Sequence, residues 1–499
     1  MQYETLAAVD LGSNSFHLQI GRVVDDQIYL LDGLREQVRL GAGLTRDKRI
    51  DRATQVRALN ALRRFSDRLR EFPEEAVRVV GTNALRVAKN SRQFLAEANE
   101  ALGFPIEIIA GREEARLIYI GVAHSLPLSL EKRLVMDIGG GSTEFIIGTG
   151  MEPELMDSLY MGCVSFSLKY FGDGKIEKSA FRQAELAARS ELQTIVKQYT
   201  RHGWAGVVAS SGTARSIASI LEANGWSEHG ISAPGVDKLR SALLKAGDIE
   251  RLSLPGMRED RASILPGGLA IMCAAFDELG FEHISVSDAA LRQGVLYDLL
   301  GRVQQHDMRE VTVREFMRRY HVDGAQAGRV AELARRLHDQ MDESENHPHA
   351  AQTLERAAAL HEIGISIAHS GYHKHSAYVI TNADMPGFSR MEQAQLARLV
   401  LAHRGKLSKL PDQSPVPGEW ELVFCLRLAS LFCRSRTDLE LPLLECEITE
   451  SGFRLLLPDS LLENRPLSAA ALTEEAEEWR SIGLRLEVKS LRDSAVKAV

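Results

Sequence analysis

The sequence predicts an α/β protein with a duplicated N-terminal half, an all-helical segment and a small α+β tail. Three observations support this prediction. Short apolar runs alternate with helical patterns up to about residue 301, a glycine-rich hairpin occurs twice, and long helical patterns fill residues 302–440. Strands that alternate with helices are typical of α/β folds. We therefore place four domains, at residues 1–124, 125–301, 302–440 and 441–499.

The expected elements follow the same plan in both halves of the first 301 residues. Each half opens with a run of strands, and the later strands each lead into a helix. Asp51 stands where an N-cap is expected, before a helix that reaches about residue 72. The expected strands are residues 6–9, 16–24, 27–31, 77–80 and 106–110, then 134–137, 144–148, 154–160, 207–210 and 284–286, with tail strands at 443–457 and 484–488.

Residues 9–15 and 136–142 are two copies of one pattern: strand, Asp, apolar residue, Gly, two small residues and Ser. The register continues without a gap to an Ile-Gly pair in each copy. Duplication of a strand–turn–strand unit explains this better than chance similarity between two glycine-rich hairpins. His17 in the first copy corresponds to Glu144 in the second, so the pair is asymmetric.

The composition is that of a globular protein, with 44% hydrophobic and 26% charged residues. Sixty Lys and Arg against 68 Asp and Glu give a net charge of −8, so bulk charge does not argue for binding to nucleic acid or a membrane surface. Five cysteines without a CxxC pair argue against a disulfide framework and structural zinc. With no signal peptide or membrane-length apolar run, we expect a cytoplasmic protein and leave peripheral membrane association open.

Each glycine-rich turn has the composition of an anion site. Small residues let the backbone approach a ligand closely, and successive N–H groups form a nest that holds an anion. Asp10 and Asp137, at the strand ends, would repel phosphate unless they hold Mg²⁺, which uses few carboxylates and keeps several waters. Two such turns facing each other would clamp a phosphate with a metal between them. The sequence has no Walker A motif, which argues against a P-loop enzyme.

A third turn, Ser-Ser-Gly-Thr at residues 210–213, lies between a strand and a helix expected over residues 214–221. Free N–H groups and the positive end of a helix suit an anion at this place. Ordinary capping by Ser211 or Thr213 is the alternative.

Several segments resemble the exopolyphosphatase/guanosine-pentaphosphate phosphatase family of the actin/Hsp70/sugar-kinase superfold. They are DLGSNSFH (10–17), GTNALRVAKN (81–90), GREEAR (111–116), DIGGGSTE (137–144) and MGCV (161–164), followed by HEIG (361–364) and HSGYHKHSAY (369–378). The resemblance implies two actin-like (ribonuclease H-like) domains, a helical HD-like domain and a small α+β C-terminal domain. The later segments indicate the long, exopolyphosphatase form.

By this resemblance Glu114 matches the catalytic glutamate that orients and deprotonates the attacking water, and Glu144 matches an essential acidic position. Mg²⁺ is the implied cofactor, with K⁺ left open, and its implied ligands are Asp10, Asp137 and Glu144. Arg86 matches an arginine near the substrate phosphates, whereas we expect Glu113 to be structural. The other phosphate-binding positions, with the third turn included, are Gly12, Ser13, Asn14, Ser15, Gly139, Gly140, Gly141, Ser142, Gly212 and Thr213.

The C-terminal histidines resemble those of HD-type phosphohydrolases, with a Glu in place of the Asp in the metal-binding pair His361-Glu362. The longer carboxylate places its oxygens differently, so we expect a degenerate HD-like domain rather than a second catalytic metal site. We expect a path for a polyanion, with a solvated basic loop as the alternative. Its expected lining is His369, His373, Lys374 and His375.

The resemblance implies a phosphoric anhydride hydrolase, an exopolyphosphatase that releases terminal orthophosphate processively from inorganic polyphosphate. The nearest alternative removes the 5′ γ-phosphate of guanosine pentaphosphate to give guanosine tetraphosphate. An actin-fold kinase would need an adenosine pocket, which the sequence does not reveal, and an alarmone-binding regulator would bind without turnover. We expect no nucleic-acid partner, and a homodimer, as is common in the family.

Overall fold

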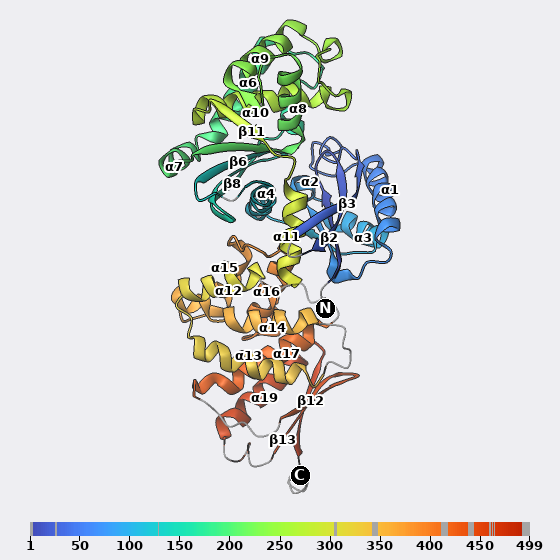
Figure 1. Cartoon of the computed structure of the whole chain (residues 1–499). Coiled ribbons are helices and arrows are strands. Elements are labelled where there is room, and N and C mark those ends of the chain that lie inside the picture. Colours follow the sequence, from blue (N-terminus) through green and yellow to red (C-terminus); the bar gives the residue numbers. More distant parts are fainter. Residues whose placement is uncertain are drawn as a thin grey trace. The chain divides into compact units, whose positions relative to one another are not determined.

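The chain forms two compact units in a computed structural model, coloured along the sequence in Figure 1. The first unit is Met1–Met308 with Pro386–Arg390, and the second is Arg309–Met385 with Met391–Val499. The finer division at residues 124, 301 and 440 stays a prediction. The described residues are 3–24, 27–127, 129–303, 307–341, 348–410, 418–437, 444–458, 461, 463 and 465–491.

The first unit contains two sheets with the same core topology. The strand order β3-β2-β1-β4-β5 of the first sheet is repeated in the second as β8-β7-β6-β9-β11, with β10 added at the edge. We call the structure around the two sheets the first and second lobes. The strands are β1 (Thr5–Leu11), β2 (Phe16–Val24), β3 (Gln27–Glu36), β4 (Val77–Gly81) and β5 (Ile106–Ile108), then β6 (Lys132–Ile138), β7 (Thr143–Thr149), β8 (Glu152–Leu159), β9 (Gly206–Ser210), β10 (Ile231–Ser232) and β11 (His283–Val286).

The strand register confirms the predicted duplication residue by residue. In the first hairpin Asp10 lies opposite His17, and in the second Asp137 lies opposite Glu144. The middle strand of each meander is irregular at the same place, after residue 20 in one copy and after residue 147 in the other. Two hairpins that share register and irregularity place their aspartates at equivalent points of the two sheets.

The helices of the first unit start close to where their capping residues predict. Asp51 accepts a hydrogen bond from the Thr54 N–H at 2.7 Å, as expected of an N-cap. Helix α8 begins at Ser211, three residues earlier than predicted, and the Ser211 hydroxyl accepts the N–H groups of the next turn. The helices are α1 (Arg52–Leu69), η1 (Glu74–Ala76), α2 (Asn83–Val87), α3 (Ser91–Leu102), α4 (Gly111–Ser125), α5 (Cys163–Tyr170), α6 (Lys178–Leu192), α7 (Val196–His202), α8 (Ser211–Ala223), α9 (Ala233–Ala246), η2 (Ile249–Arg251), η3 (Glu259–Ile264), α10 (Leu265–Leu279) and α11 (Leu291–Val303).

One stretch of the first unit has the length and apolar composition of a membrane span, which the sequence analysis did not anticipate. Within the described ranges this is Glu259–Leu279, which covers η3 and α10. Its most apolar window is 72% buried inside the structure. Helix α10 packs against α5, α6 and α9, as a core helix of the second lobe does.

Helices α4 and α11 each pack on the sheet of the other lobe, and they contact each other between the two sheets (Figure 1). Helix α4 follows the first sheet but packs on β6, β7 and β8, whereas α11 follows the second sheet and packs on β1 and β4. Two glycines allow the helices to approach. A Cβ on Gly121 would lie 2.1 Å from the Ala290 carbonyl oxygen, and one on Gly294 would lie 1.7 Å from that of Leu117.

A buried ion network fixes the first turn of α4. Both Glu113 carboxylate oxygens accept hydrogen bonds from Arg116 at 2.8 Å, and the Gly387 N–H donates to Glu113 at 2.9 Å. Arg116 and Arg78 also bind Asp298, and their charges hold the pKa of that carboxyl below its usual range despite burial. Glu113 is therefore structural, as expected, and the network orients the turn that carries Glu114.

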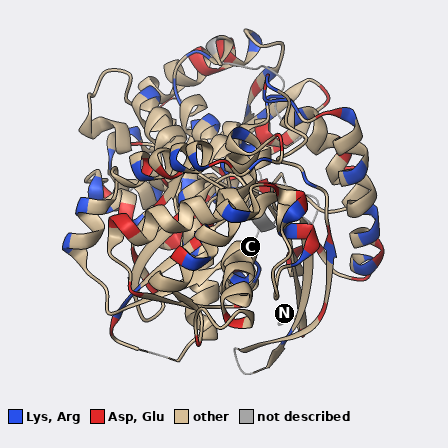
Figure 2. Ribbon diagram, turned by 90° about the horizontal axis from the view of Figure 1, so that it is seen from above, with Lys and Arg blue, Asp and Glu red and all other residues tan. Residues whose placement is uncertain are grey.

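The second unit is helical and ends in a small sheet, which confirms that part of the predicted fold. Strand β13 pairs antiparallel with β12 and parallel with β14. Charged residues of both signs are interspersed along the ribbon, as the balanced composition predicts (Figure 2). The elements are α12 (Met308–Arg319), α13 (Gly324–His338), α14 (Pro348–Leu360), η4 (Ile363–Ser366), α15 (Tyr372–Asn382), α16 (Arg390–Ala402), η5 (Leu407–Lys409), α17 (Glu419–Phe432), η6 (Cys433–Ser435), β12 (Glu445–Thr449), β13 (Gly452–Pro458), α19 (Pro466–Arg480) and β14 (Arg485–Leu491).

Substitution Gly294→Ala should destabilise the protein by more than about 3 kcal/mol, because the new methyl group would meet the α4 backbone, which cannot move aside. The measurement is the free energy of unfolding in denaturant. Gly328→Ala is the matched control, since it also lies inside a helix but has open space around it. We expect the control to be neutral or stabilising by about 0.5–1 kcal/mol. Equal effects of the two changes would contradict the close helix contact.

Candidate active site

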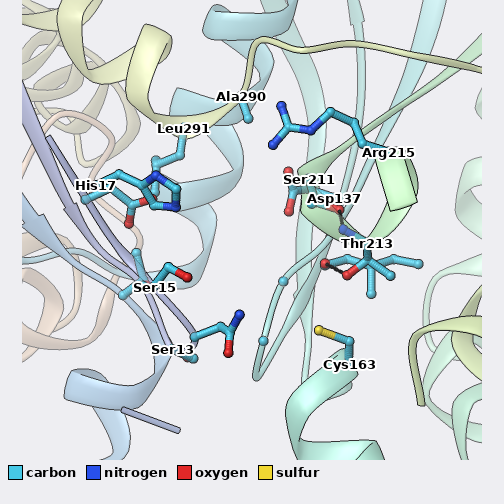
Figure 3. A pocket seen from close by; sticks show the side chains of 18 of the residues that line it. Ser13, Ser15, His17, Asp137, Cys163, Ser211, Thr213, Arg215, Ala290 and Leu291 are labelled. Carbon is cyan, nitrogen blue, oxygen red and sulfur yellow. Dashed lines mark hydrogen bonds between the residues drawn. The ribbon is translucent and has the colours of Figure 1, made fainter. Parts of the chain in front are cut away.

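The two hairpin turns face each other across one cavity of about 400 Å³. Figure 3 shows Ser13, Ser15 and His17 on one side of this cavity, with Asp137 and Thr213 on the other. Asp10 lines the same cavity as Asp137. The duplicated strand ends therefore bring both aspartates to a single site, as the sequence predicts.

Glycine is required in the second turn because the first turn and the start of α2 approach it closely. A Cβ on Gly140 would lie 2.8 Å from the Ser13 Cβ, and one on Gly141 would lie 2.3 Å from the Asn83 Oδ1. Backbone hydrogen bonds hold each turn from outside. The Ser13 carbonyl accepts the N–H of Gly41 at 2.7 Å, and the Gly139 carbonyl accepts the N–H of Cys163, the first residue of α5, at 2.9 Å. The backbone of both turns is thus fixed before a ligand binds.

Most of the residues predicted for the site line this cavity. The structure places these there: Asp10, Gly12, Ser13, Asn14, Ser15, Glu114, Asp137, Gly139, Gly140, Gly141, Ser142, Gly212 and Thr213. Arg86 and Glu144 do not line it. Arg86 donates to the Glu114 Oε2 at 3.0 Å and to the Ile109 carbonyl at 2.8 Å, so it contacts the predicted catalytic glutamate from behind.

Glu144 is buried beside the second turn, and its Oε1 accepts a hydrogen bond from the Ser158 hydroxyl at 2.7 Å. Burial raises its pKa well above the usual range, and repulsion from Glu114 and Asp137 adds to the rise. Because these charges act on it, Glu144 belongs to the electrostatic environment of the cavity although its side chain does not line it.

Buried carboxyl groups repel one another in this site. Burial raises the pKa of Asp10 to about 7 and that of Asp137 to about 6, and neighbouring acids add to both shifts. Burial also raises the pKa of Glu114, although the adjacent Arg86 opposes the rise. Carboxyl groups whose pKa values approach neutrality are a feature of sites that bind cations or exchange protons.

Three buried side-chain atoms in or next to the first turn are available to bind a ligand. Asp10 Oδ1, Asn14 Nδ2 and Ser15 Oγ are buried without a hydrogen-bond partner among the described residues. A buried polar atom without a partner is costly, and a bound ligand removes that cost. No cluster of three or more His, Cys, Asp or Glu side chains in the described ranges is arranged to hold a metal. An Mg²⁺ site completed by water and phosphate oxygens fits this sparse set, because Mg²⁺ needs few carboxylates.

Five arginines bring positive charge to the rest of the cavity, and none of them was assigned to the site from the sequence. Burial lowers the pKa of Arg261, and the nearby Arg35 and Arg258 lower it further. Burial likewise lowers the pKa of Arg292, which Asp10 partly opposes. A concave site with such a field favours a polyanion. The lining arginines are Arg35, Arg215, Arg258, Arg261 and Arg292.

These arginines come from separate elements, which explains why no motif in the sequence marks them. They lie on β3, on α8, at the start of η3 and on α11. Among the five cavity arginines only Arg292 is marked by a sequence pattern, the Ala-Leu-Arg stretch at the start of α11. The others have no neighbouring pattern that separates them from solvated surface arginines.

The residues predicted for a polyanion path lie in the second unit. His369 lines a cavity of about 700 Å³ there, together with Arg404 and Lys406. The Nδ1 of His373 is buried without a hydrogen-bond partner among the described residues, whereas Lys374 is exposed. Glutamates also line this cavity, and Arg427 forms a two-point ion pair with Glu475. The role of His369, His373, Lys374 and His375 stays a prediction.

Two similar α/β lobes that enclose buried acids, arginines and glycine-rich turns have the features expected of an enzyme that acts on phosphate groups. Comparison with known proteins agrees. Residues 19–303 match the model of the Ppx/GppA phosphatase family, and residues 308–476 match domain III of Ppx/GppA phosphatases. The chain belongs to the Ppx/GppA phosphatase family and has its actin-like fold, so the protein is a phosphatase.

Solved structures support the same assignment. An exopolyphosphatase from Cytophaga hutchinsonii is 27% identical, with a TM-score of 0.55, and the match covers 60% of this chain and 98% of that one. The PPX-GPPA enzyme of Aquifex aeolicus is 25% identical, with a TM-score of 0.50, and the match covers 59% of this chain and 98% of that one.

His17 should make the stability of the protein depend on pH. Burial and the surrounding arginines lower its pKa to about 2, so the folded protein keeps it neutral while the unfolded chain protonates it near pH 6.5. His17 therefore contributes a loss of stability of about 2 kcal/mol between pH 7.5 and pH 5, which the raised pKa values of Asp10 and Asp137 oppose. Between the two pH values, the free energy of unfolding in denaturant should change by about 2 kcal/mol in the stabilising direction in His17→Asn relative to the unsubstituted protein. His229→Asn, at an exposed position, should show the same change with pH as the unsubstituted protein. The same pH dependence in His17→Asn would contradict the buried neutral imidazole.

Proposed function

We propose that the protein is an Mg²⁺-dependent exopolyphosphatase that releases orthophosphate from the end of inorganic polyphosphate. The main support is the cavity where two aspartate-bearing turns meet five arginines. The arginines of such a site offer positive charge to a chain of phosphates. Its acidic groups can hold one metal ion and one water molecule. The family membership and the likeness to the Cytophaga hutchinsonii exopolyphosphatase agree with this substrate class.

Glu114 is the residue we assign to the attacking water. It lines the cavity, and its carboxylate is held by Arg86 on one side and by the rigid first turn of α4 on the other. Burial raises its pKa towards the range in which a carboxylate is an effective general base near neutral pH. In the proposed reaction Glu114 accepts a proton from water as the water oxygen bonds to the terminal phosphorus and the bridging P–O bond breaks.

The arginines and the turns account for the remaining catalytic requirement. Phosphoryl transfer needs the substrate held in line and the charge on the equatorial oxygens offset, with little covalent work from the protein. The start of α8 lines the cavity through Ser211, Gly212 and Thr213, and the positive end of this helix favours an anion there. Arg215 and Arg292 extend the positive wall. We propose that these groups bind the terminal phosphate and stabilise its transition state.

Mg²⁺ would be held by Asp10 and Asp137, with Glu144 contributing negative charge from behind the second turn. The partnerless Asp10 Oδ1 is the atom that most directly supports this assignment. When bound, the metal supplies charge compensation and lets the acids and the phosphates share one cavity. K⁺ as an additional cation would use the same site. Guanosine pentaphosphate would also use it as a substrate in place of polyphosphate, and hydrolysis assays with the two substrates distinguish these possibilities.

Phosphate release from long-chain polyphosphate in the presence of Mg²⁺ tests the proposed activity, with guanosine pentaphosphate measured beside it. We expect turnover of polyphosphate, with a higher kcat/KM than for the nucleotide. Glu114→Gln should lower kcat by about 10²–10⁴-fold, because it removes the base, while polyphosphate binding survives. Glu131→Gln, a change at an exposed position, is the control and should match the unsubstituted protein. Retained turnover in Glu114→Gln would refute the role of Glu114, and preference for the nucleotide would reassign the substrate.

Mg²⁺ should stabilise the folded protein, since a ligand that binds only the native state raises the unfolding midpoint. We expect Mg²⁺ to raise the Tm of the unsubstituted protein by several degrees and to have little effect on Asp10→Asn, which lacks the partnerless carboxylate oxygen. Asp277→Asn, which removes a partly exposed ion pair of the second lobe, should keep the full Mg²⁺ response. An equal shift in Asp10→Asn would place the metal elsewhere.

A further inference from the structure

A carboxylate joins two of the cavity arginines across the lobes. Arg35 lies on β3 of the first lobe, and its guanidinium donates to the Asp260 Oδ2 at 2.9 Å. Arg258 lies beside η3 of the second lobe and donates to both oxygens of the same carboxylate at 3.0 Å. The Gln37 side chain also donates, weakly, to the Asp260 carbonyl at 3.5 Å. The Arg35 contact thus links segments 225 residues apart in the sequence.

The two arginines face the cavity, but the carboxylate that binds them does not line it. Arg35 and Arg258 are lining residues, whereas Asp260 is not. The two-point contact of Arg258 with a carboxylate has the geometry with which an arginine binds phosphate. Asp260 is therefore bound as an anion by arginines that a phosphate in the cavity could also bind.

The ion pairs between Asp260 and the two arginines are weak enough for another anion to replace the carboxylate. The side chains of Arg35, Arg258 and Asp260 are 31%, 61% and 28% exposed. Ion pairs exposed to this degree contribute little to stability, because water and salt screen them. The lobes do not depend on this link, since the buried contact between α4 and α11 already joins them. An internal phosphate of a polyphosphate chain carries one negative charge, as a carboxylate does, and its two free oxygens suit the guanidinium fork equally well.

We propose that Asp260 competes with a substrate phosphate for Arg35 and Arg258, holding both arginines in the free protein and releasing them when the polyanion binds in the cavity. A phosphate other than the one being cleaved then binds Arg35 from one lobe and Arg258 from the other. This inference rests on the proposed function, because it assumes a substrate with several linked phosphates. Asp260 acts as a specificity-determining residue. It lowers the affinity for every anion and can be displaced by one that offers further phosphates to both arginines.

The test is Asp260→Asn, measured by steady-state hydrolysis of long-chain polyphosphate over a range of salt concentrations. The substitution keeps the shape of the side chain but removes the competing charge. We expect KM to fall about two- to fivefold with kcat unchanged, the range set by the strength of an exposed ion pair. The decline of affinity with salt should also steepen, because the substrate gains contacts with cations that are no longer neutralised. Arg258→Gln should raise KM, because it removes one of the two arginines that would bind the phosphate.

Asp277→Asn is the matched control, since it removes one negative charge and one partly exposed arginine contact from the same lobe, outside the cavity. An equal fall in KM in both variants would overturn the inference in favour of a bulk charge effect. A rise in KM in Asp260→Asn would overturn it by showing that the carboxylate positions the arginines instead. An unchanged KM would also overturn it. If the unsubstituted protein does not hydrolyse polyphosphate, the proposed function fails first, and the two failures are thereby distinguished.

Discussion

The mutual repulsion of carboxyl groups inside one cavity is the constraint on which the rest of the site depends. Asp10, Glu114 and Asp137 line the cavity, and Glu144 lies just behind it, each with a pKa raised by burial. Folding brings these groups together although they repel one another. The surrounding arginines reduce that cost, and a bound cation would reduce it further. A site with this balance favours ligands that bring positive and negative charge together, as a metal ion and a phosphate chain do.

The rigid supports of the site follow from the same constraint. Groups that repel one another keep their positions only if the backbone around them cannot relax. The buried network of Glu113, Arg116 and Asp298 holds the start of α4, and backbone hydrogen bonds to residues outside the turns hold both hairpins. Glycines at the contact between the turns then allow an approach that a side chain would prevent. Close packing directly behind the cavity thus keeps the mutually repelling carboxyl groups in place.

Local sequence patterns were enough to predict the duplicated hairpins and the two aspartates of the acidic site. The Asp-Gly turns are contiguous motifs, and strand pairing alone places Asp10 opposite His17 and Asp137 opposite Glu144. The catalytic role of Glu114 was inferred from resemblance to a family. The sequence pattern alone does not indicate it, because a glutamate in the first turn of a helix is common for dipole reasons alone. The cavity arginines could not be predicted in this way. Arg35, Arg215 and Arg261 come together only when strands and helices from both lobes are placed in space. Arg86 was predicted to lie near phosphate, but its long side chain turns towards Glu114 and the Ile109 carbonyl.

The crossed packing of α4 and α11 also bears on how such a molecule could arise. Each helix covers the sheet of the lobe to which it does not belong in sequence. An ancestor with a single lobe would have left this apolar helix face bare, unless two copies donated their terminal helices to each other. Such a swapped homodimer, fused head to tail into one gene, would give the arrangement seen here, with the cavity at the former subunit interface. The difference between His17 and Glu144 would then date from after the fusion, when the two halves were free to diverge.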